Sequence, residues 1–442
     1  MYLETIQIQG FKSLANVELR DLAAINVFHG LNDVGKSNVL QALDLFFQLL
    51  PIGARALTGE EESSTGLSMG FLQPYSYSVF RQGGNGRIVW EAQVCATRDS
   101  AAFPVRLVLE RTSPKEDLQV TLFWEVPPAI TREGDISQRW FAELCEDPAN
   151  DFTLVNAERR FAKEWLGEET APIDYAPHYR HGSPVGAEQL KQVLFEAVPH
   201  RDLRQRERFK RLAKILDEQF GVGELDVTWD APRELERRFG EPSRYVRDII
   251  VRFLRPDMPE PLNLADVGSG VQQLILMLGQ MLFNPAQTVG IEEPEMNLSP
   301  DWQIKLLNVF KALVAPKTGV LEQLFITSHS LAFRPESADY YDVTYDPQAQ
   351  ATLVTRRPLE ERRKYFDVLG LTPAEGEELG PYLNPQNQIT VPQRVIDDLG
   401  LKTYEPVFFI KGDPHWRLCT KEELLARMQT EEQTYADQED RV

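Results

Sequence analysis

A glycine-rich segment near the start of the chain has the residue types and spacing of a phosphate-binding loop, G-x-x-x-x-G-K-S. Glycines let backbone N–H groups close around phosphate oxygens, the lysine reaches the β- and γ-phosphates, and the serine hydroxyl can hold Mg²⁺. We therefore predict that the segment binds the phosphates of a nucleoside triphosphate, ATP, together with Mg²⁺. The nucleotide-binding residues predicted here are Gly30, Leu31, Asn32, Asp33, Val34, Gly35, Lys36, Ser37 and Asn38.

The segments on either side of this loop are of the kind that positions it. Residues 25–28 form an apolar run typical of a buried strand, and residues 39–50 have the apolar periodicity of a helix. A loop between a strand and a helix presents the phosphates to the positive end of the helix dipole. The alternative, a glycine turn that carries Lys-Ser by chance, does not account for these flanks.

Two adjacent acids could supply the second half of the site. Glu292 and Glu293 directly follow the apolar run 287–291. The carboxyl ends of strands are where ligands bind in open α/β sheets. We predict that Glu292 holds Mg²⁺ together with Ser37, and that Glu293 is the base that orients the attacking water. A solvated acidic turn is the alternative interpretation.

A histidine follows the next apolar strand. Residues 325–328 lead into His329, which could contact the γ-phosphate or the attacking water and so detect an intact triphosphate. A satisfied structural histidine is the alternative, and it is weakened by the acid pair that precedes this strand. The predicted catalytic residues are Glu293, His329 and Lys36.

A turn of small residues, Gly268, Ser269 and Gly270, leads into a further predicted helix. Exposed N–H groups at a helix start make a second anion-binding surface, although a plain capping turn explains these residues equally well. A single phosphate-binding loop does not need two such turns. We therefore predict that this one contacts a nucleotide bound by another subunit.

The order of these motifs resembles the ABC-type ATPases of the RecF/SMC group, and most closely the OLD-like AAA-family ATPases of bacteria. The resemblance covers residues 1–340 and implies an α/β ABC-type P-loop ATPase with an antiparallel β layer and a helical insertion lobe. It also implies a homodimer or higher homo-oligomer in which Ser269 and Gly270 of one copy face Lys36 of the other. The matching segments are residues 6–14, 30–38, 156–159, 268–270, 291–303 and 327–330.

The sequence departs from this family at two places. The usual Leu-Ser-Gly-Gly signature is absent, and Asn297 and Ser299 stand where histidines are frequent. Both departures concern activation by the second subunit and the turnover rate. A C-terminal Toprim nuclease is common in the OLD group, but no apolar strand after residue 360 ends in an Asp-x-Asp pair. Since metal-dependent phosphodiester cleavage needs clustered carboxylates, we do not expect nuclease activity from this chain.

We predict an ATPase domain over residues 1–360, with the helical lobe at about 186–262, and a small α+β appendage over 361–442. Residues 387–401 and 407–412 of the appendage resemble the swapped-hairpin domains of the AbrB, SpoVT and MraZ families. In those families the unit dimerises and often binds DNA. Gln388 and Gln393 stand where basic residues are frequent, which favours dimerisation or partner docking, and an unrelated appendage is an equal alternative.

Composition limits the class of protein. The net charge is −20, the three cysteines are scattered, and neither a membrane span nor a signal peptide is present, so we expect a cytoplasmic protein. Basic residues gather at 201–214 and 233–255 and could track DNA phosphates. Acids interspersed among them favour intramolecular pairing as the alternative.

The leading hypothesis is an ATP-hydrolysing dimeric switch in a DNA-related process such as phage defence or DNA repair. Such a switch would close on ATP, open after hydrolysis and control a separately encoded effector protein. The alternatives are a non-hydrolysing nucleotide-binding scaffold and a DNA-binding regulator that acts through the appendage.

Overall fold

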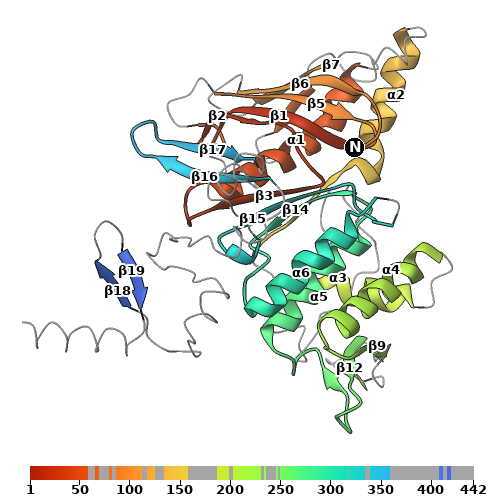
Figure 1. The fold of residues 1–442 in the computed structure, drawn as a ribbon. Helices are drawn as coiled ribbons and strands as arrows, with labels where there is room; N and C mark the ends of the chain where they lie inside the picture. The colour runs from red at the N-terminus through yellow and green to blue at the C-terminus, as the bar shows by residue number, and fades with distance from the viewer. Residues whose placement is uncertain are drawn as a thin grey trace, which may run out of the picture. The chain divides into compact units, whose positions relative to one another are not determined.

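The structure is a computed structural model of the whole chain, and it divides into two compact units, Met1–Arg357 and Pro358–Val442. Its elements are shown in Figure 1. The residues that the structure describes are 1–57, 65–68, 79–81, 86–111, 117–124, 134–157, 187–198, 203–229, 233–234, 245–246, 249–316, 318–333, 339–358, 408–411 and 416–419.

The first unit contains an antiparallel sheet of six strands in the order β2-β1-β5-β6-β7-β4. In β2 and in the middle of β1, buried apolar side chains alternate with more exposed ones, as expected for a sheet with one face on the core and one face in water. The predicted strands at 86–96, 104–111 and 118–126 correspond to β5, β6 and β7. The bounds are β1 Tyr2–Phe11, β2 Leu14–Leu19, β4 Thr65–Ser68, β5 Arg87–Cys95, β6 Ala102–Arg111 and β7 Asp117–Trp124.

A second six-stranded sheet lies at the centre of the unit, in the order β17-β16-β3-β15-β14-β8. All neighbouring pairs from β16 to β8 are parallel, and β17 is antiparallel to β16. β14 and β15 are buried along their whole length, which explains why their central residues, 289–291 and 324–326, carry no polar side chain. The bounds are β3 Ile25–Gly30, β8 Phe152–Val155, β14 Thr288–Glu292, β15 Gln323–Ser328, β16 Tyr340–Asp346 and β17 Ala351–Arg357.

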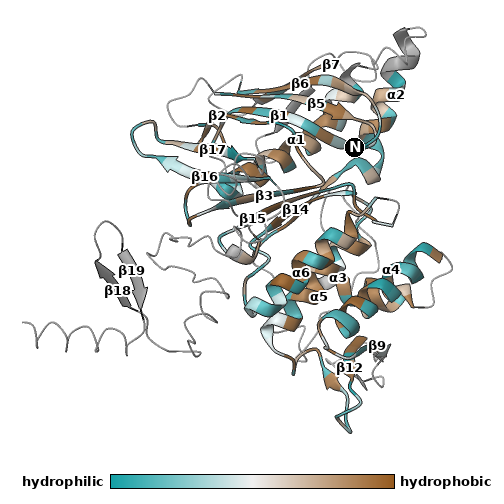
Figure 2. Ribbon diagram, viewed as in Figure 1, coloured by the Kyte–Doolittle hydropathy of each residue, from teal (hydrophilic) through white to brown (hydrophobic). Residues whose placement is uncertain are grey.

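Helix α1 lies between the two sheets with α2 packed beside it, and α3, α4, α5 and α6 lie on the opposite side of the central sheet (Figure 1). One apolar cluster therefore fills the space around α1, and a second joins the central sheet to α3, α4, α5 and α6. β14, β15 and much of α5 are brown in Figure 2, as their burial requires. The bounds are α1 Lys36–Leu57, α2 Gly134–Glu146, α3 Ala187–Ala197, α4 Leu203–Lys214, α5 Ser269–Phe283 and α6 Pro300–Leu313, with 3₁₀ turns at Pro148–Asn150 and Leu331–Phe333.

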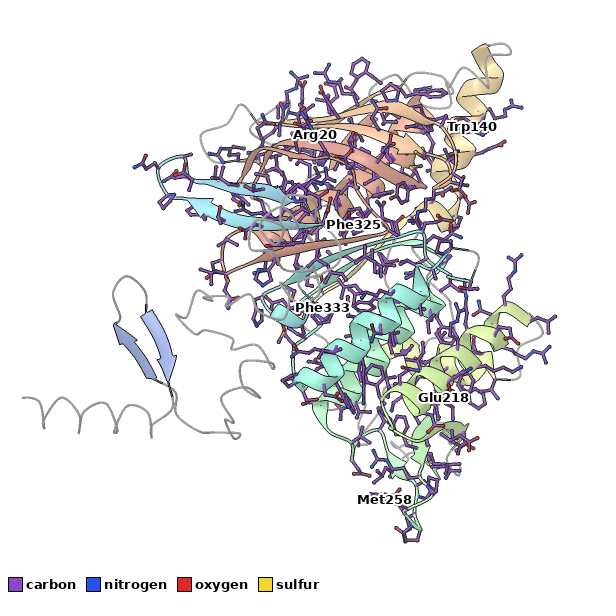
Figure 3. The ribbon with its side chains drawn as sticks, viewed as in Figure 1. Arg20, Trp140, Glu218, Met258, Phe325 and Phe333 are labelled. Carbon is purple, nitrogen blue, oxygen red and sulfur yellow. The ribbon has the colours of Figure 1, made fainter. Side chains whose placement is uncertain are left out.

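Phe325 on β15 shows how the layers meet. Its side chain is fully buried, and its ring centroid lies 6.2 Å from that of Phe152 on β8, which stacks in turn on Phe47 of α1. Figure 3 shows Phe325 on the central sheet, well inside the unit. The helix that starts at the phosphate-binding loop is thus fixed to β8 and through it to β15, the strands on either side of β14, which carries the acid pair.

The region 186–262 is mixed rather than helical, which corrects the prediction of a helical lobe. After α4 the chain makes a π-helical turn, Ile215–Gln219, and then enters strands. Leu225 and Val227 are buried and their neighbours less so, and the same alternation of burial holds for Ile249, Val251 and Phe253; this period of two is that of a strand. The strand bounds are β9 Glu224–Trp229, β10 Arg233–Glu234, β11 Tyr245–Val246, β12 Ile249–Leu254 and β13 Leu262–Asn263.

In the second unit the described residues form one antiparallel hairpin, β18 Phe408–Lys411 with β19 Trp416–Cys419. The predicted segment 387–401 lies outside the described residues, so the resemblance to swapped-hairpin domains stays a prediction. Across the described parts of the chain, no helix is both long and apolar enough to cross a lipid bilayer.

The fold generates a stability prediction at Trp90, a fully buried side chain on β5 whose Nε1 donates to the Ala42 carbonyl oxygen of α1 at 3.1 Å. Trp90→Phe removes this side-chain hydrogen bond to the carbonyl and creates a small cavity. We expect a loss of about 1–3 kcal/mol in the free energy of unfolding. Urea unfolding followed by far-UV circular dichroism measures it. Trp124→Phe, at a partly exposed ring, is the matched control, and equal effects of the two variants would contradict the prediction.

Candidate nucleotide-binding site

Three neighbouring parallel strands, β3, β15 and β14, end at the same edge of the central sheet. The phosphate-binding loop follows β3, His329 follows β15, and the acid pair closes β14. Residues nearly 300 positions apart in the sequence are thereby brought to one place, as ligand sites in open α/β sheets require. Glu293 extends this edge, because its backbone N–H donates to the Thr327 carbonyl oxygen at 2.9 Å.

The phosphate-binding loop is built around Lys36, the first residue of α1. No acidic residue lies in the first turn of this helix, so the positive end of its dipole is free to attract an anion. The Lys36 Nζ donates to the carbonyl oxygens of Gly30 and Leu31, at 3.0 and 2.6 Å. The ammonium is thus held inside its own loop, in the position from which it can exchange carbonyl oxygens for phosphate oxygens.

Burial lowers the pKa of Lys36, and the nearby carboxylates of Glu293, Glu295 and Asp33 act in the opposite direction. The buried ammonium has carbonyl oxygens as hydrogen-bond partners, and the carboxylates compensate its charge only in part. A bound polyanion would therefore stabilise it. The electrostatics of Lys36 therefore favour binding of a phosphate group.

The loop is braced from outside by two side chains, Ser13 from the motif at residues 6–14 and Thr352, which was not predicted. Thr352 Oγ1 donates to the Val34 carbonyl oxygen at 2.8 Å and lies 2.6 Å from Ser13 Oγ. A Cβ on Gly35, which has φ +96°, would lie 2.1 Å from that Thr352 oxygen. Only glycine fits there, because the loop runs against the braces. Asn38, predicted to contact the nucleotide, donates through Nδ2 to Ser13 Oγ at 2.8 Å.

These braces come from the turn between β1 and β2 and from the β16–β17 hairpin. The first matches the motif at residues 6–14, but the hairpin at 340–357 was not predicted. Its signal was present, since Tyr341 and Val343 are buried on one face and polar residues alternate with them. The position of Thr352 against the loop could not be read from that pattern.

Lys12 also approaches the site from the β1–β2 turn. It is half-buried, its Nζ donates to Gln41 Oε1 at 2.6 Å, and its backbone is held at a φ of +45°. Burial lowers the pKa of Lys12, and the Glu292 carboxylate partly offsets this effect. The site thus has a second cation close to the acid predicted to hold Mg²⁺.

Glu292 is buried at the end of β14, and its Oε2 accepts from the Ala157 backbone N–H, just after β8, at 3.3 Å. Carboxylate and hydroxyl oxygens are ligands that Mg²⁺ accepts, and it usually binds through one or two protein groups together with substrate phosphates. Glu292 and Ser37 fit that pattern. In the part of the chain that the structure describes, no group of three His, Cys, Asp or Glu side chains is arranged to hold a metal alone.

Glu293 and His329 face one another across the strand ends. Glu293 has a φ of +42°, a conformation that non-glycine residues rarely adopt and that occurs preferentially at functional sites. Its Oε1 lies 4.0 Å from His329 Nδ1. The imidazole is about half exposed, at 47%, whereas the Glu293 side chain is 28% exposed. A partly solvated carboxylate beside an imidazole is an arrangement that can position a water molecule.

The predicted second anion-binding turn forms the start of α5. Gly268 is the N-cap, no side chain caps the helix, and Gly268 and Ser269 are exposed. A Cβ on Gly270 would lie 2.7 Å from the Asn297 carbonyl oxygen, so the helix start packs closely on the turn after the acid pair. The exposed N–H groups are available to an external anion, and their contact with a second subunit's nucleotide stays a prediction.

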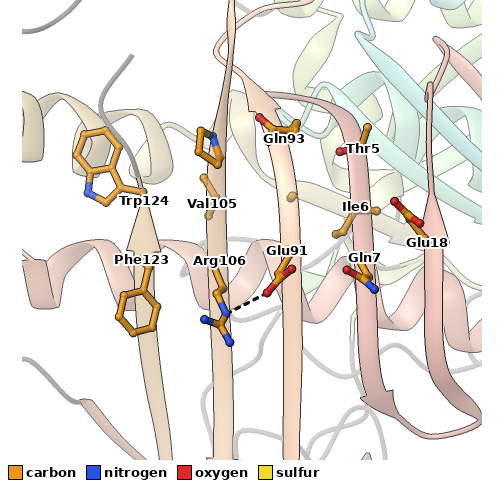
Figure 4. Close-up of a pocket in the computed structure, with 12 residues that line it drawn as sticks. Thr5, Ile6, Gln7, Glu18, Glu91, Gln93, Val105, Arg106, Phe123 and Trp124 are labelled. Carbon is orange, nitrogen blue, oxygen red and sulfur yellow. Dashed lines mark ion pairs between the residues drawn. The ribbon is translucent and has the colours of Figure 1, made fainter. Parts of the chain in front are cut away.

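A cavity of about 570 Å³ lies elsewhere, on the outer face of the antiparallel sheet (Figure 4). Glu91 and Arg106 form an ion pair across it at 3.2 Å, with both side chains 47% exposed, and Arg106 lies over the Phe123 ring. Cross-strand pairs of this kind stabilise a solvated sheet face. With acids in its lining and no loop or helix start, this cavity does not have the groups of a phosphate site.

Several members of the two basic groups pair within the molecule. Lys210 lies 3.2 Å from Glu207, Lys214 lies 3.8 Å from Glu218, and Arg252 lies 2.5 Å from Asp226. These pairs agree with the pairing alternative for the residues concerned. Much of the second group lies outside the described residues, and contact with DNA stays a prediction.

Two segments of the chain match family models. Residues 1–68 match a model described as "AAA ATPase domain", and residues 168–334 match one described as "AAA domain, putative AbiEii toxin, Type IV TA system". Both models describe AAA-type ATPase domains. The first segment holds the phosphate-binding loop, and the second holds the acid pair and His329. The matches therefore support nucleotide binding of the ATPase type. No curated protein matches the sequence.

Among solved structures, the chain is similar to heads of SMC proteins. For an Smc head bound to the C-winged helix domain of ScpA, identity is 13%, the TM-score is 0.47, and the match covers 82% of this chain and 100% of that one. For the SMC head domain from Thermotoga maritima, identity is 14% and the TM-score is 0.41, and the match covers 81% of this chain and 99% of that one. Membership of the OLD-like subgroup stays a prediction.

The braces on the loop generate a testable prediction. Thr352→Val keeps the shape of the side chain but removes the hydroxyl that holds Val34 and Ser13. An unsatisfied buried partner costs about 1–3 kcal/mol. If the loop must be ordered to bind phosphates, a loss of this size lowers the affinity for ATP by about tenfold. Isothermal titration with Mg²⁺·ATP measures this. Thr355→Val on the exposed side of the same strand is the control, and unchanged affinity of Thr352→Val would rule out the brace.

Proposed function

We propose that this chain is a Mg²⁺-dependent ATPase that acts as a dimeric switch. The observation that carries the proposal is the meeting of Lys36, the acid pair and His329 at one edge of the central sheet. Each part of a phosphoryl-transfer site is represented there: a phosphate cradle, metal-binding oxygens and a group beside which water can be held.

The residues would divide the work as follows. Lys36 and the backbone N–H groups of the loop bind the β- and γ-phosphates, and Ser37 with Glu292 holds Mg²⁺. The metal would neutralise charge on the phosphates. Glu293 accepts a proton from the attacking water, and His329 contacts the γ-phosphate end of the site. The two acids differ in burial, 8% exposure for the Glu292 residue against 28% for the Glu293 side chain, which suits metal binding by the first and water activation by the second.

A second copy of the chain would complete the site. The exposed N–H groups at the start of α5 can bind an anion, and the nucleotide of a partner copy would supply one. Leu31 in the phosphate-binding loop is 46% exposed, and a partner copy that faces this loop would cover it. Closure on ATP and opening after hydrolysis would then transmit a signal to a separately encoded effector, in phage defence or DNA repair.

The cradle is tested by Lys36→Ala. Loss of the buried cation removes charge-assisted contacts to two phosphates, so we expect the affinity for Mg²⁺·ATP to fall by about 100-fold or more. Isothermal titration at high protein concentration measures it. Lys305→Ala, at a lysine paired with Asp301 on the surface of α6, is the control. Wild-type protein that does not bind Mg²⁺·ATP would overturn the proposal.

The switch is tested by Glu293→Gln. Removal of the base should lower the turnover number by a factor of about 10²–10⁴ while ATP binding persists, so that a closed dimer accumulates. Phosphate release and light scattering with ATP measure both effects. Glu18→Gln, at an exposed carboxylate on β2, is the control. A non-hydrolysing scaffold is the second candidate, and it predicts no difference between Glu293→Gln and wild type in either measurement.

A further inference from the structure

The third acid of the motif, Glu295, is buried to 4% exposure, although it is not part of the proposed metal or water site. A buried carboxylate is costly unless hydrogen bonds compensate it. Here Oε1 accepts from three donors at the end of β15 and just after it: Ser328 Oγ at 2.7 Å, the His329 N–H at 2.8 Å and the Ser330 N–H at 3.2 Å. Glu295 therefore fixes the backbone that carries His329.

The same oxygen also lies beside the imidazole. His329 Nδ1 is 3.2 Å from Glu295 Oε1 and 4.0 Å from Glu293 Oε1. Because Glu295 contacts both the backbone and the ring of His329, the place of the imidazole depends on the position of one buried side chain.

Gln303 on α6 makes a second link between the same two segments. Its Oε1 accepts from Ser330 Oγ at 2.6 Å, and its Nε2 donates to the Leu298 carbonyl oxygen at 2.9 Å. The Leu298 N–H in turn donates to the Glu295 carbonyl oxygen at 3.1 Å. The turn at 295–298 and the segment at 328–330 are thus tied at both ends.

That turn bears directly on the start of α5. The Asn297 carbonyl oxygen lies 2.7 Å from where a Cβ on Gly270 would be, and Asn297 has a φ of +58°. A shift of the turn must therefore move the helix start or open a gap against it, because packed interiors do not deform continuously.

We propose that Glu295, together with Gln303, is a positioning residue that couples the place of His329 to the start of α5 in the same protomer. The inference rests on the proposed function, in which His329 contacts one nucleotide and α5 faces another. The link then transmits the state of one nucleotide to the surface that binds the second. The physical basis is a continuous chain of hydrogen bonds and one close backbone contact.

The first test measures the link without any activity. Hydrogen–deuterium exchange of the nucleotide-free full chain is compared for wild type, Glu295→Leu, Glu295→Gln and Gln303→Met. The leucine and methionine variants should exchange faster both at 328–330 and at 268–272. Glu295→Gln keeps an acceptor oxygen and should resemble wild type at both segments. Gln303→Met decides the outcome if Glu295→Leu fails to fold.

The second test uses kinetics. Glu295→Leu should lower kcat by about 10- to 100-fold with KM changed by less than about twofold, because the residue does not contact the nucleotide. In a His329→Ala background it should cause no further loss, since both changes remove the same function. Glu295→Gln should restore kcat to within about threefold of wild type.

The outcomes separate the inference from the proposed function. Faster exchange at 328–330 with unchanged exchange at 268–272 would make Glu295 a local support and overturn the inference. Independent, multiplying losses in the double variant would also overturn it. A wild-type protein without ATP turnover would refute the proposed function instead, and the exchange measurement would still decide whether the link exists.

Discussion

The arrangement depends on one constraint: the parallel register of β3, β15 and β14. This register places Ser328 opposite His29 and Thr327 opposite Glu292, so all three strands end at the same level. A slip of one residue would turn buried side chains such as Phe325 away from their apolar neighbours. The hydrophobic cores on both faces of the central sheet thus fix the spacing of the polar groups at its edge. The burial of β3, β14 and β15 therefore determines the geometry of the site.

The phosphate-binding loop is also supported from the side of the central sheet opposite α5 and α6. The antiparallel sheet contributes Ser13, the hairpin contributes Thr352, and both lie against Gly35 in the phosphate-binding loop. α1 sits between the two sheets and begins inside this brace. A loop that must surround phosphates without collapsing needs such support, because its glycines have little conformational preference of their own. The two sheets therefore act as a clamp on the start of α1.

Local chemistry could be read from the sequence wherever it depends on neighbouring residues. The apolar runs at 25–28 and 287–291 identified buried strands, and the residues after them identified the two halves of the site. The loop, the acid pair and His329 could be related to one another because parallel strands in α/β sheets carry ligands at their carboxyl ends. The prediction of a helical lobe over 186–262 was wrong at β9 and β12, two short strands with alternating burial that lie in a region otherwise rich in charged residues.

Contacts that join segments distant in sequence could not be predicted in this way. Thr352 reaches a loop more than 300 positions earlier, and its sequence neighbours show only an ordinary strand. Glu295 was visible as an acid after the pair, but nothing in the local sequence showed that its side chain is buried against the end of β15. The buried carboxylate of Glu295 accepts hydrogen bonds from Ser328, His329 and Ser330. This buried side chain therefore determines the position of the exposed imidazole of His329. The position of the His329 imidazole thus depends on the buried carboxylate of Glu295. The polarity of glutamate would place this residue on the surface if the sequence pattern alone were considered.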